Sequence, residues 1–267
     1  MWYNENGKLV ESVSFDSNNR SFKYGDGIFE TIRIFNGKIF NKENHLRRIV
    51  YSLKVVKISL PISASDLLHL AIDLASKNGI FNGGLRISIY RYSSGKYSPD
   101  SSEGRFFIES YALENLFFEL NKNGLDIDYY HSHFKSPSLL SNLKTTSAIF
   151  YVLASIEKKE RKLDDLLILN TEGNPIEACS SNLFIVLNQQ LFTPPLESGC
   201  LDGCMRSLVL QNFDVIQKKI SFEDIEESEE LFLTNSNSIA WVRSIGSTQL
   251  LSSQYASKVV EMCNRLI

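Results

Sequence analysis

Two charged residues stand in settings where a charge could take part in catalysis. Lys144 lies in a short polar stretch, residues 141–148, between a proline-containing loop and an apolar helical pattern. A lysine there can be exposed and idle, whereas a desolvated lysine can act as a Schiff-base nucleophile or carry protons. Glu177 opens a strongly apolar run that continues to Leu187. Because an isolated buried carboxylate is costly, we expect Glu177 to be paired with a basic group or hydrogen-bonded.

Two further stretches could bind an anion such as phosphate. Gly199 and Gly203 lie directly before a helical pattern, where free backbone N–H groups can point at a phosphate. A loop that binds no ligand can have the same glycine-rich composition as this stretch. Arg47 and Arg48 follow His45 at the start of an earlier helical pattern, where basic residues commonly form a solvated face. Taken singly, these stretches leave both interpretations open.

The sequence predicts no metal site. His131 and His133 would share one face of a strand, but no acidic or thiol residue accompanies them at a ligand spacing. Cys200 and Cys204 lack a second cysteine pair for zinc. Four cysteines in 267 residues are too few for a disulfide framework, so we expect reduced thiols.

Composition excludes several classes of protein. Hydrophobic residues make up 43% and charged residues 22% of the chain, as in ordinary globular proteins. A net charge of −3 offers no basic footprint for nucleic acid. No apolar run approaches the roughly 18 residues that a membrane-spanning helix needs, and no secretory signal is visible. We therefore expect a soluble cytoplasmic protein that binds neither nucleic acid nor a membrane.

The elements that must position these residues alternate between strands and helices. In the first part, period-two and helical patterns predict a hairpin turning at Asn36-Gly37 and then two helices and two strands. In the second part we expect a helix over 146–162, strands over 165–170, 177–187, 191–193 and 231–234, a helix from about 203, a helical start over 223–230 and a last helix over 255–267.

These patterns predict an α+β or mixed α/β protein of two domains. We expect a small N-terminal domain over 1–115 and a larger C-terminal domain over 125–267. Between the two domains the strand and helix periodicity is interrupted by Asn121, Asn123 and Gly124, which indicates a linker over 116–124.

Taken in order, the motifs resemble those of the class IV aminotransferase-like enzymes, which use pyridoxal 5′-phosphate (PLP) on the fold called type IV. The similarity covers almost the whole chain. The matching segments are 24–31 for the early strand, 45–48 for the His-x-x-Arg motif, 142–144 for the lysine, 177 with 181–184 for the carboxylate strand, and 193–206 for the phosphate loop.

The resemblance implies a role for each residue type. Lys144 would hold the cofactor as a Schiff base and move protons, and Glu177 would keep the pyridine nitrogen protonated. Arg48 would grip the phosphate together with backbone amides at Cys204 and Met205. The other cofactor-binding positions implied are Ser181, Asn182, Leu201, Gly203, Asn235 and Ser236.

The same resemblance implies the substrate side and the assembly of the site. Phe29, Thr31, Arg91 and Lys96 would face the substrate, with Lys96 standing where an arginine is expected. The family places its cofactor between the two domains and forms homodimers, so we expect both here, with a small amine or amino acid as substrate.

Residue differences favour one activity within the family. Phe29 replaces a tyrosine that D-amino-acid aminotransferases use, and Ile149 replaces a tyrosine of the branched-chain enzymes. Met205 stands where the branched-chain enzymes have threonine, and residues 202–206 look like the Gly-Ile-Met-Arg form of 4-amino-4-deoxychorismate lyases. The residues after Lys144 depart from that lyase pattern. We predict the lyase of folate biosynthesis. The alternatives are a branched-chain or D-amino-acid aminotransferase and a non-catalytic relative that binds a small molecule or partner chain.

Overall fold

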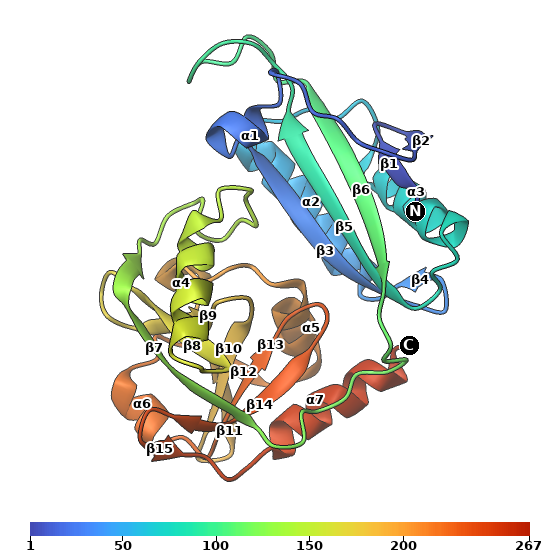
Figure 1. Ribbon diagram of the computed structural model, residues 1–267. Coiled ribbons are helices and arrows are strands. Elements are labelled where there is room, and N and C mark those ends of the chain that lie inside the picture. Colours follow the sequence, from blue (N-terminus) through green and yellow to red (C-terminus); the bar gives the residue numbers. More distant parts are fainter. The chain divides into compact units, whose positions relative to one another are not determined.

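The computed structural model describes residues 1–267 and divides them into two compact units (Figure 1). The first unit comprises Met1–Leu116 and the short segment Lys144–Ala148, and the second comprises Phe117–Leu143 and Ile149–Ile267. The stretch predicted as a linker therefore belongs mostly to the second unit. Residues 144–148 return to the first unit, which no sequence pattern indicated.

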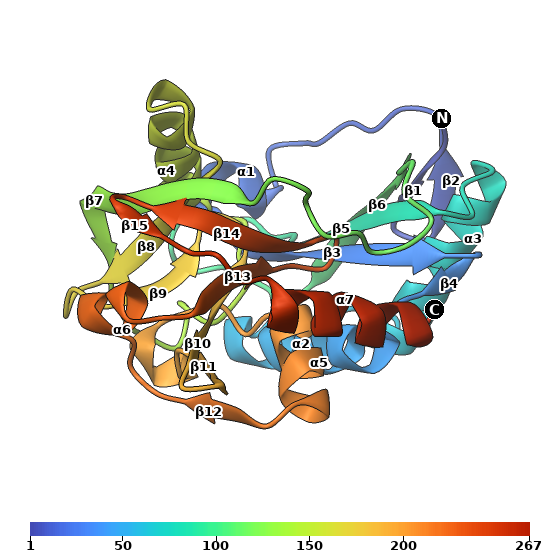
Figure 2. The same cartoon turned by 90° about the horizontal axis from the view of Figure 1, so that it is seen from below.

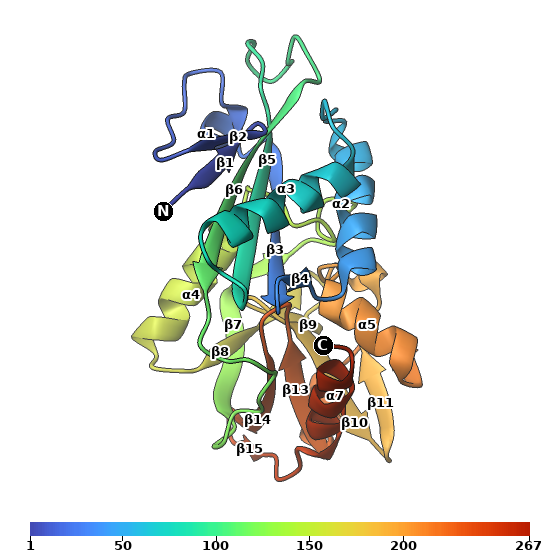
Figure 3. The same ribbon diagram turned by 90° about the vertical axis from the view of Figure 1, so that its right-hand side faces the viewer.

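The first unit is an antiparallel six-stranded sheet in the order β2-β1-β6-β5-β3-β4. Helices α2 and α3 cover one face of this sheet (Figure 3). Its elements are β1 (Tyr3–Glu5), β2 (Lys8–Val10), α1 (Arg20–Tyr24), β3 (Gly27–Phe35), β4 (Lys38–Ile39), α2 (Lys42–Val56), α3 (Ala64–Lys77), β5 (Gly83–Arg91) and β6 (Gly104–Ala112).

Alternation along the strands separates the core of the first unit from its second face. Ile28 and Ile32 in β3, together with Ile87 in β5, are buried in the core that the helices complete. The predicted hairpin is confirmed, since Asn36 and Gly37 both adopt positive φ, as the two-residue turn requires. The alternate residues Phe29 and Thr31 of β3 point to the opposite face of the sheet.

The second unit is built on a nine-stranded sheet in the order β12-β11-β10-β13-β14-β7-β8-β9, with β15 paired to β14. A further pairing of β9 with β10 closes part of this sheet on itself. Its elements are β7 (Leu125–Lys135), α4 (Ile149–Glu160), β8 (Asp165–Asn170), β9 (Pro175–Ala178), β10 (Asn182–Leu187), β11 (Gln190–Thr193), a 3-10 turn (Leu196–Ser198), α5 (Cys204–Asn212), β12 (Val215–Gln217), α6 (Phe222–Glu226), β13 (Glu230–Thr234), β14 (Ile239–Ile245), β15 (Thr248–Gln249) and α7 (Gln254–Arg265).

Helix α7 packs against β13 and β14 (Figure 2). Its first turn is anchored by Glu230, whose buried carboxylate accepts hydrogen bonds from the backbone N–H groups of Tyr255 and Ala256. An acidic group is favoured there by the helix dipole. None of the helices has the length and apolar character that a membrane crossing requires.

Three predicted elements differ from the structure. The strand expected over 177–187 is two antiparallel strands, β9 and β10, separated by a reversal at residues 179–181. Both strands are buried throughout, so their apolar runs merge in the sequence. The helix expected from 146 begins at Ile149, because residues 144–146 pair with β3 instead. The acidic stretch 223–230 is helical only to Glu226, and Glu230 begins β13.

Candidate active site

Lys144 is held by backbone hydrogen bonds to the first residues of β3. The N–H of Phe29 donates to the Lys144 carbonyl at 2.9 Å, and the N–H of Thr146 donates to the Gly27 carbonyl at 3.0 Å. The Thr146 hydroxyl donates to the Gly25 carbonyl at 2.9 Å. Main-chain pairing, independent of the lysine side chain, therefore sets the position of Lys144 in the first unit.

Two glycines, one just before β3 and one at its first position, allow this close approach. A Cβ on Gly27 would lie 2.5 Å from the Ile89 carbonyl oxygen and 3.2 Å from the Thr146 hydroxyl. Gly25 adopts a φ of +64°, and a Cβ there would lie 2.9 Å from that of Ser147. Both positions therefore need glycine, since side chains would displace the segment that carries Lys144.

The Lys144 side chain lies over an aromatic ring that also contacts an arginine. Its Nζ is 4.4 Å from the centroid of the Phe29 ring, and the Cζ of Arg86 is 3.9 Å from the same centroid. Cations are attracted to the face of an aromatic ring at such distances. Thr31, the second predicted substrate residue of β3, is paired with Arg86 in the sheet register.

Arg86 is the functional candidate that sequence reasoning missed. The half-buried guanidinium forms no hydrogen bond or ion pair with the chain, and burial lowers its pKa although Glu109 on β6 opposes this. An arginine in this state is suited to bind an anion. The alternation of β5 could have shown that Arg86 points away from the core, but only the pairing of β5 with β3 places it against Phe29.

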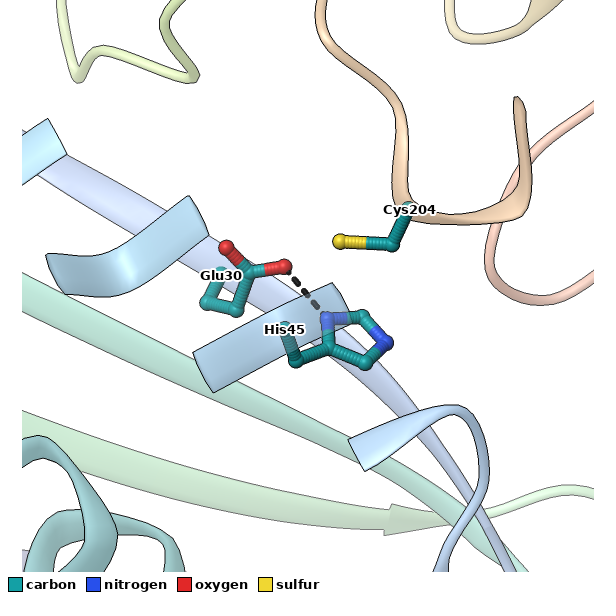
Figure 4. A group of neighbouring side chains, drawn as sticks. All are labelled: Glu30, His45 and Cys204. Atoms are coloured by element: carbon teal, nitrogen blue, oxygen red, sulfur yellow. Dashed lines mark hydrogen bonds and ion pairs between the residues drawn. The ribbon is translucent and has the colours of Figure 1, made fainter. Parts of the chain in front are cut away.

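Arg48 forms a buried ion pair with Glu30, and His45 joins the same carboxylate. The Nε of Arg48 donates to Glu30 Oε2 at 3.1 Å, and a second guanidinium N–H donates to Oε1. His45 Nδ1 lies 2.7 Å from Oε1 (Figure 4). Burial by itself raises the pKa of Glu30, but the Arg48 charge and the His45 hydrogen bond outweigh it and hold the pKa at about 2.

Arg91 and Lys96 differ in their surroundings. Arg91 is buried, and its guanidinium donates to Asp26 at 2.9 Å and to the carbonyls of Val56 and Lys57 at the end of α2. These contacts favour a structural role for Arg91. Lys96 is exposed in the loop after β5, and its role toward the substrate stays a prediction.

Glu177 lies in the second unit with each carboxylate oxygen engaged. Oε1 accepts hydrogen bonds from Lys135 Nζ at 2.6 Å and from the Tyr151 hydroxyl at 2.8 Å. Oε2 accepts one from the Leu201 N–H at 2.7 Å. The expected basic partner of this buried carboxylate is therefore Lys135.

The loop before α5 is tied to the strand that follows Glu177. The Asn182 side-chain amide donates to the Leu201 carbonyl at 2.8 Å, and a Cβ on Gly203 would lie 1.8 Å from Asn182 Oδ1. The backbone here leaves no room for a side chain at Gly203. Asn142 ties the loop from the other side, donating to the Cys200 carbonyl at 2.6 Å.

Helix α5 begins at this loop without a side-chain cap. Gly203 is its N-cap, and Cys204 and Met205 form its buried first turn. An uncapped helix start presents backbone N–H groups and a positive dipole end to an anion. The Met205 sulfur itself lies 3.7 Å from the sulfur of Cys263 in α7, so its side chain belongs to the core.

The turn between β13 and β14 contains the remaining predicted residues. The Asn235 side chain donates to the Ser181 hydroxyl at 3.0 Å and accepts from the N–H groups of Asn237 and Ser238. Ser236 lies within this turn. Thr234, the last residue of β13, has a fully buried hydroxyl without a hydrogen-bond partner.

The structure thus groups the predicted residues by unit. In the first unit it brings Lys144 and Phe29 into contact and places Arg48 against Glu30. In the second unit, hydrogen bonds connect Glu177 to Leu201, Leu201 to Asn182, and Asn235 to Ser181, the neighbour of Asn182. Gly203, Cys204 and Met205 lie at the start of α5, and Ser236 lies in the turn after β13.

Comparison with known proteins assigns the family. Residues 27–245 match the model of the amino-transferase class IV family. The chain belongs to this family.

The relatives of this class IV chain carry several activities. An aminodeoxychorismate lyase from Vibrio harveyi is 28% identical over 81% of this chain and 82% of its own. A D-alanine aminotransferase from Bacillus licheniformis is 25% identical over 86% and 83%. The crystal structure of a branched-chain aminotransferase from Thermoproteus uzoniensis with norvaline matches with a TM-score of 0.85 at 25% identity, over 99% of this chain and 94% of that one.

These matches confirm the expected fold, type IV, and the expected cofactor. Class IV aminotransferases depend on PLP, and the residues present suit it. Lys144 would supply an amine for the aldehyde, and the uncapped start of α5 would supply phosphate donors. The orphaned buried hydroxyl of Thr234 marks a polar position that the chain itself leaves unsatisfied.

The ion pair of Glu30 gives a testable prediction for stability. Replacing Glu30 by Gln leaves Arg48 buried without its counter-charge, and we expect a loss of about 3–5 kcal/mol in the free energy of unfolding near neutral pH. The pKa of Glu30 is lowered from 4.5 to about 2 in the folded protein. Its contribution is therefore present above pH 4.5 and lost as the pH falls toward 2. Denaturant unfolding measured across this pH range should show the difference between the wild type and Glu30→Gln shrinking.

The matched control is Glu103→Gln, which removes an exposed pair with Arg105. We expect it to change the unfolding free energy by less than about 1 kcal/mol. Equal losses for the two variants, or a difference that does not vary with pH, would show that the Glu30 pair does not have this role.

Proposed function

We propose that this class IV protein is a PLP-dependent 4-amino-4-deoxychorismate lyase, which forms 4-aminobenzoate and pyruvate for folate biosynthesis. The arrangement of Lys144, Phe29 and Arg86 carries the proposal. Two cationic groups contact the Phe29 ring. One is the Lys144 amine, which can react with an aldehyde. The other is the Arg86 guanidinium, which has no carboxylate partner. This combination suits an anionic substrate that is handled at its amino group.

The choice of the lyase rests on hydroxyl groups that the aminotransferases of the family would need and that this chain lacks. Phe29 has no hydroxyl for a substrate carboxylate. Ile149 begins α4 as an exposed apolar residue, and Met205 points into the core beside Cys263. The relative from Vibrio harveyi carries the same activity.

The residues of the chain divide the chemistry between them. PLP, when bound, supplies the electron sink that makes a proton on the substrate acidic. Lys144 Nζ is the base that removes the proton from C4 of the substrate ring. The bond between C3 and the enolpyruvyl oxygen then breaks, the ring becomes aromatic, and the departing enolate takes up the proton that Lys144 removed and becomes pyruvate.

The remaining charged residues bind and orient. Glu177 would accept a hydrogen bond from the pyridine N–H and keep that nitrogen protonated. Arg48 would bind the phosphate, and the first amides of α5 would supply donors for it. Lys144 would be the group that moves protons. Arg86 binds a carboxylate of the substrate.

The first test is product release without an amino acceptor. Purified protein loaded with PLP is incubated with 4-amino-4-deoxychorismate in the absence of any 2-oxo acid, and 4-aminobenzoate and pyruvate are measured together. We expect both in equal amounts. Lys144→Ala should form neither, because the base is gone.

Other outcomes identify the alternatives. Turnover of amino acids that requires a 2-oxo acid would show an aminotransferase, as in the relatives from Bacillus licheniformis and Thermoproteus uzoniensis. Lys144→Ala protein with unchanged product formation would reject the role of Lys144. A wild type that binds PLP and turns over neither substrate class would indicate a binding protein.

Arg86 gives a prediction for substrate binding. Hydrogen bonds to a charged group contribute about 1.5–3 kcal/mol, so we expect Arg86→Ala to raise KM by about 10- to 100-fold. If Arg86 binds the ground and transition states equally, kcat stays unchanged. Steady-state kinetics of 4-aminobenzoate formation would measure both.

Arg243→Gln is the control for this variant, since Arg243 pairs with Asp126 on an exposed surface of the second unit. We expect its kinetics to match the wild type. An unchanged KM for Arg86→Ala would remove Arg86 from the substrate-binding residues.

We also propose that two copies of this chain associate through α4. Ile149, Val152, Leu153 and Ile156 share one face of this helix at helical spacing, and all four are exposed. A contiguous apolar face of this kind marks an association surface. A second copy is the occupant that the family resemblance implies.

Replacing Ile156 by Glu should dissociate this dimer, because a charge buried in an apolar interface without a partner is costly. Sedimentation velocity would measure the oligomeric state, with a dimer expected for the wild type and a monomer for Ile156→Glu. The control is Val50→Glu, an equally exposed apolar position on α2, which should remain dimeric. A monomeric wild type, or a dimeric Ile156→Glu, would reject this interface.

A further inference from the structure

Lys135, at the end of β7, has an ammonium group that is completely coordinated. Its Nζ donates to Glu177 Oε1 at 2.6 Å, to the Tyr151 hydroxyl at 2.6 Å and to the Ser141 carbonyl at 2.9 Å. An ammonium has three protons, so these three acceptors use all of them. The side chain is 12% exposed, which makes the pair with Glu177 a nearly dry one.

Tyr151 of α4 is the second residue that binds the same carboxylate oxygen. It accepts from Lys135 and donates to Glu177 Oε1 at 2.8 Å. Burial and the neighbouring carboxylate both raise the pKa of Tyr151, so its hydroxyl stays protonated and remains a donor.

Counting the acceptor sites of the Glu177 carboxylate shows how many have no donor from the chain. A carboxylate offers about four lone-pair sites. Lys135 and Tyr151 fill those of Oε1, and the Leu201 N–H takes one on Oε2. One acceptor site of Oε2 is therefore left for a further donor.

We propose that Lys135 and Tyr151 are positioning residues that hold the Glu177 carboxylate immobile and open to a single additional donor, the pyridine N–H of the cofactor. The inference rests on the role proposed above for Glu177. The ammonium offsets the cost of burying the carboxylate, and the hydroxyl fixes its rotation. Neither residue touches the substrate.

The same network ties Glu177 to the segments around it. Leu201 donates to Glu177 from the loop before α5, and Ser141, which accepts from Lys135, lies three residues before Lys144. Loss of Lys135 should therefore affect the cofactor more than an ordinary ion pair would.

The experiment compares Lys135→Met with Lys135→Arg, which keeps the charge, and with Tyr151→Phe, which keeps the ring. Lys219→Met is the matched control, because Lys219 also pairs with a glutamate at 2.6 Å but on the exposed surface. PLP labelled with 15N at the ring nitrogen is bound to each protein, and the 15N NMR shift reports whether that nitrogen is protonated. Equilibrium dialysis gives the dissociation constant of PLP.

We expect a protonated ring nitrogen in the wild type, Lys135→Arg and Lys219→Met. In Lys135→Met and Tyr151→Phe the shift should move toward the unprotonated value. The dissociation constant of PLP should rise about tenfold in Lys135→Met, which corresponds to roughly 1.4 kcal/mol. Thermal unfolding establishes whether each variant is folded. If Lys135→Met is not folded, the 15N shift of Tyr151→Phe tests the inference.

The results separate this inference from the proposed function. A 15N shift that is unchanged in the folded variants would overturn the positioning role but would not contradict the proposed lyase activity. An unprotonated ring nitrogen in the wild type would overturn both this inference and the role of Glu177. A wild type that binds no PLP at the Lys144 amine would contradict the proposed function itself.

Discussion

A charged side chain removed from water must find an opposite charge, and this constraint organises both units. In the first unit, Glu30 at the centre of β3 binds Arg48 and His45 of α2, which joins the helix to the strand. In the second unit, Glu177 binds Lys135 and Tyr151 and also receives the Leu201 N–H. Neither carboxylate would be tolerated alone, so each pair also positions the main chain around it.

The position of Lys144 depends on main-chain geometry in a similar way. The segment Lys144–Ala148 leaves the second unit to pair with the start of β3, and the neighbouring loop residue Asn142 is bound to the loop before α5. Gly25 and Gly27 permit the approach by having no Cβ. Main-chain hydrogen bonds therefore fix the position of the residue to which we assign the role of reactive lysine.

The relatives of this chain carry three activities on one fold. This agrees with a fold in which different residues serve the cofactor and the substrate. Residues expected to serve the cofactor lie at strand ends and helix starts, where backbone groups converge. Phe29 and Arg86 stand on the face of the first sheet opposite its helices. Proteins of one fold differ in function through the residues of their sites, so substitution on that face would alter the proposed substrate site without a change of fold.

By itself the sequence determined the family, the cofactor, the hairpin at Asn36-Gly37 and the need of Glu177 for a basic partner, because spacing, turn chemistry and the cost of burial are local properties. Tertiary structure decided the rest. The break between β9 and β10, the return of residues 144–148 to the first unit, the choice of Lys135 as the partner and the contact of Arg86 with Phe29 all depend on which strands pair and in which register. Register is set by long-range pairing, and no local pattern carries that information.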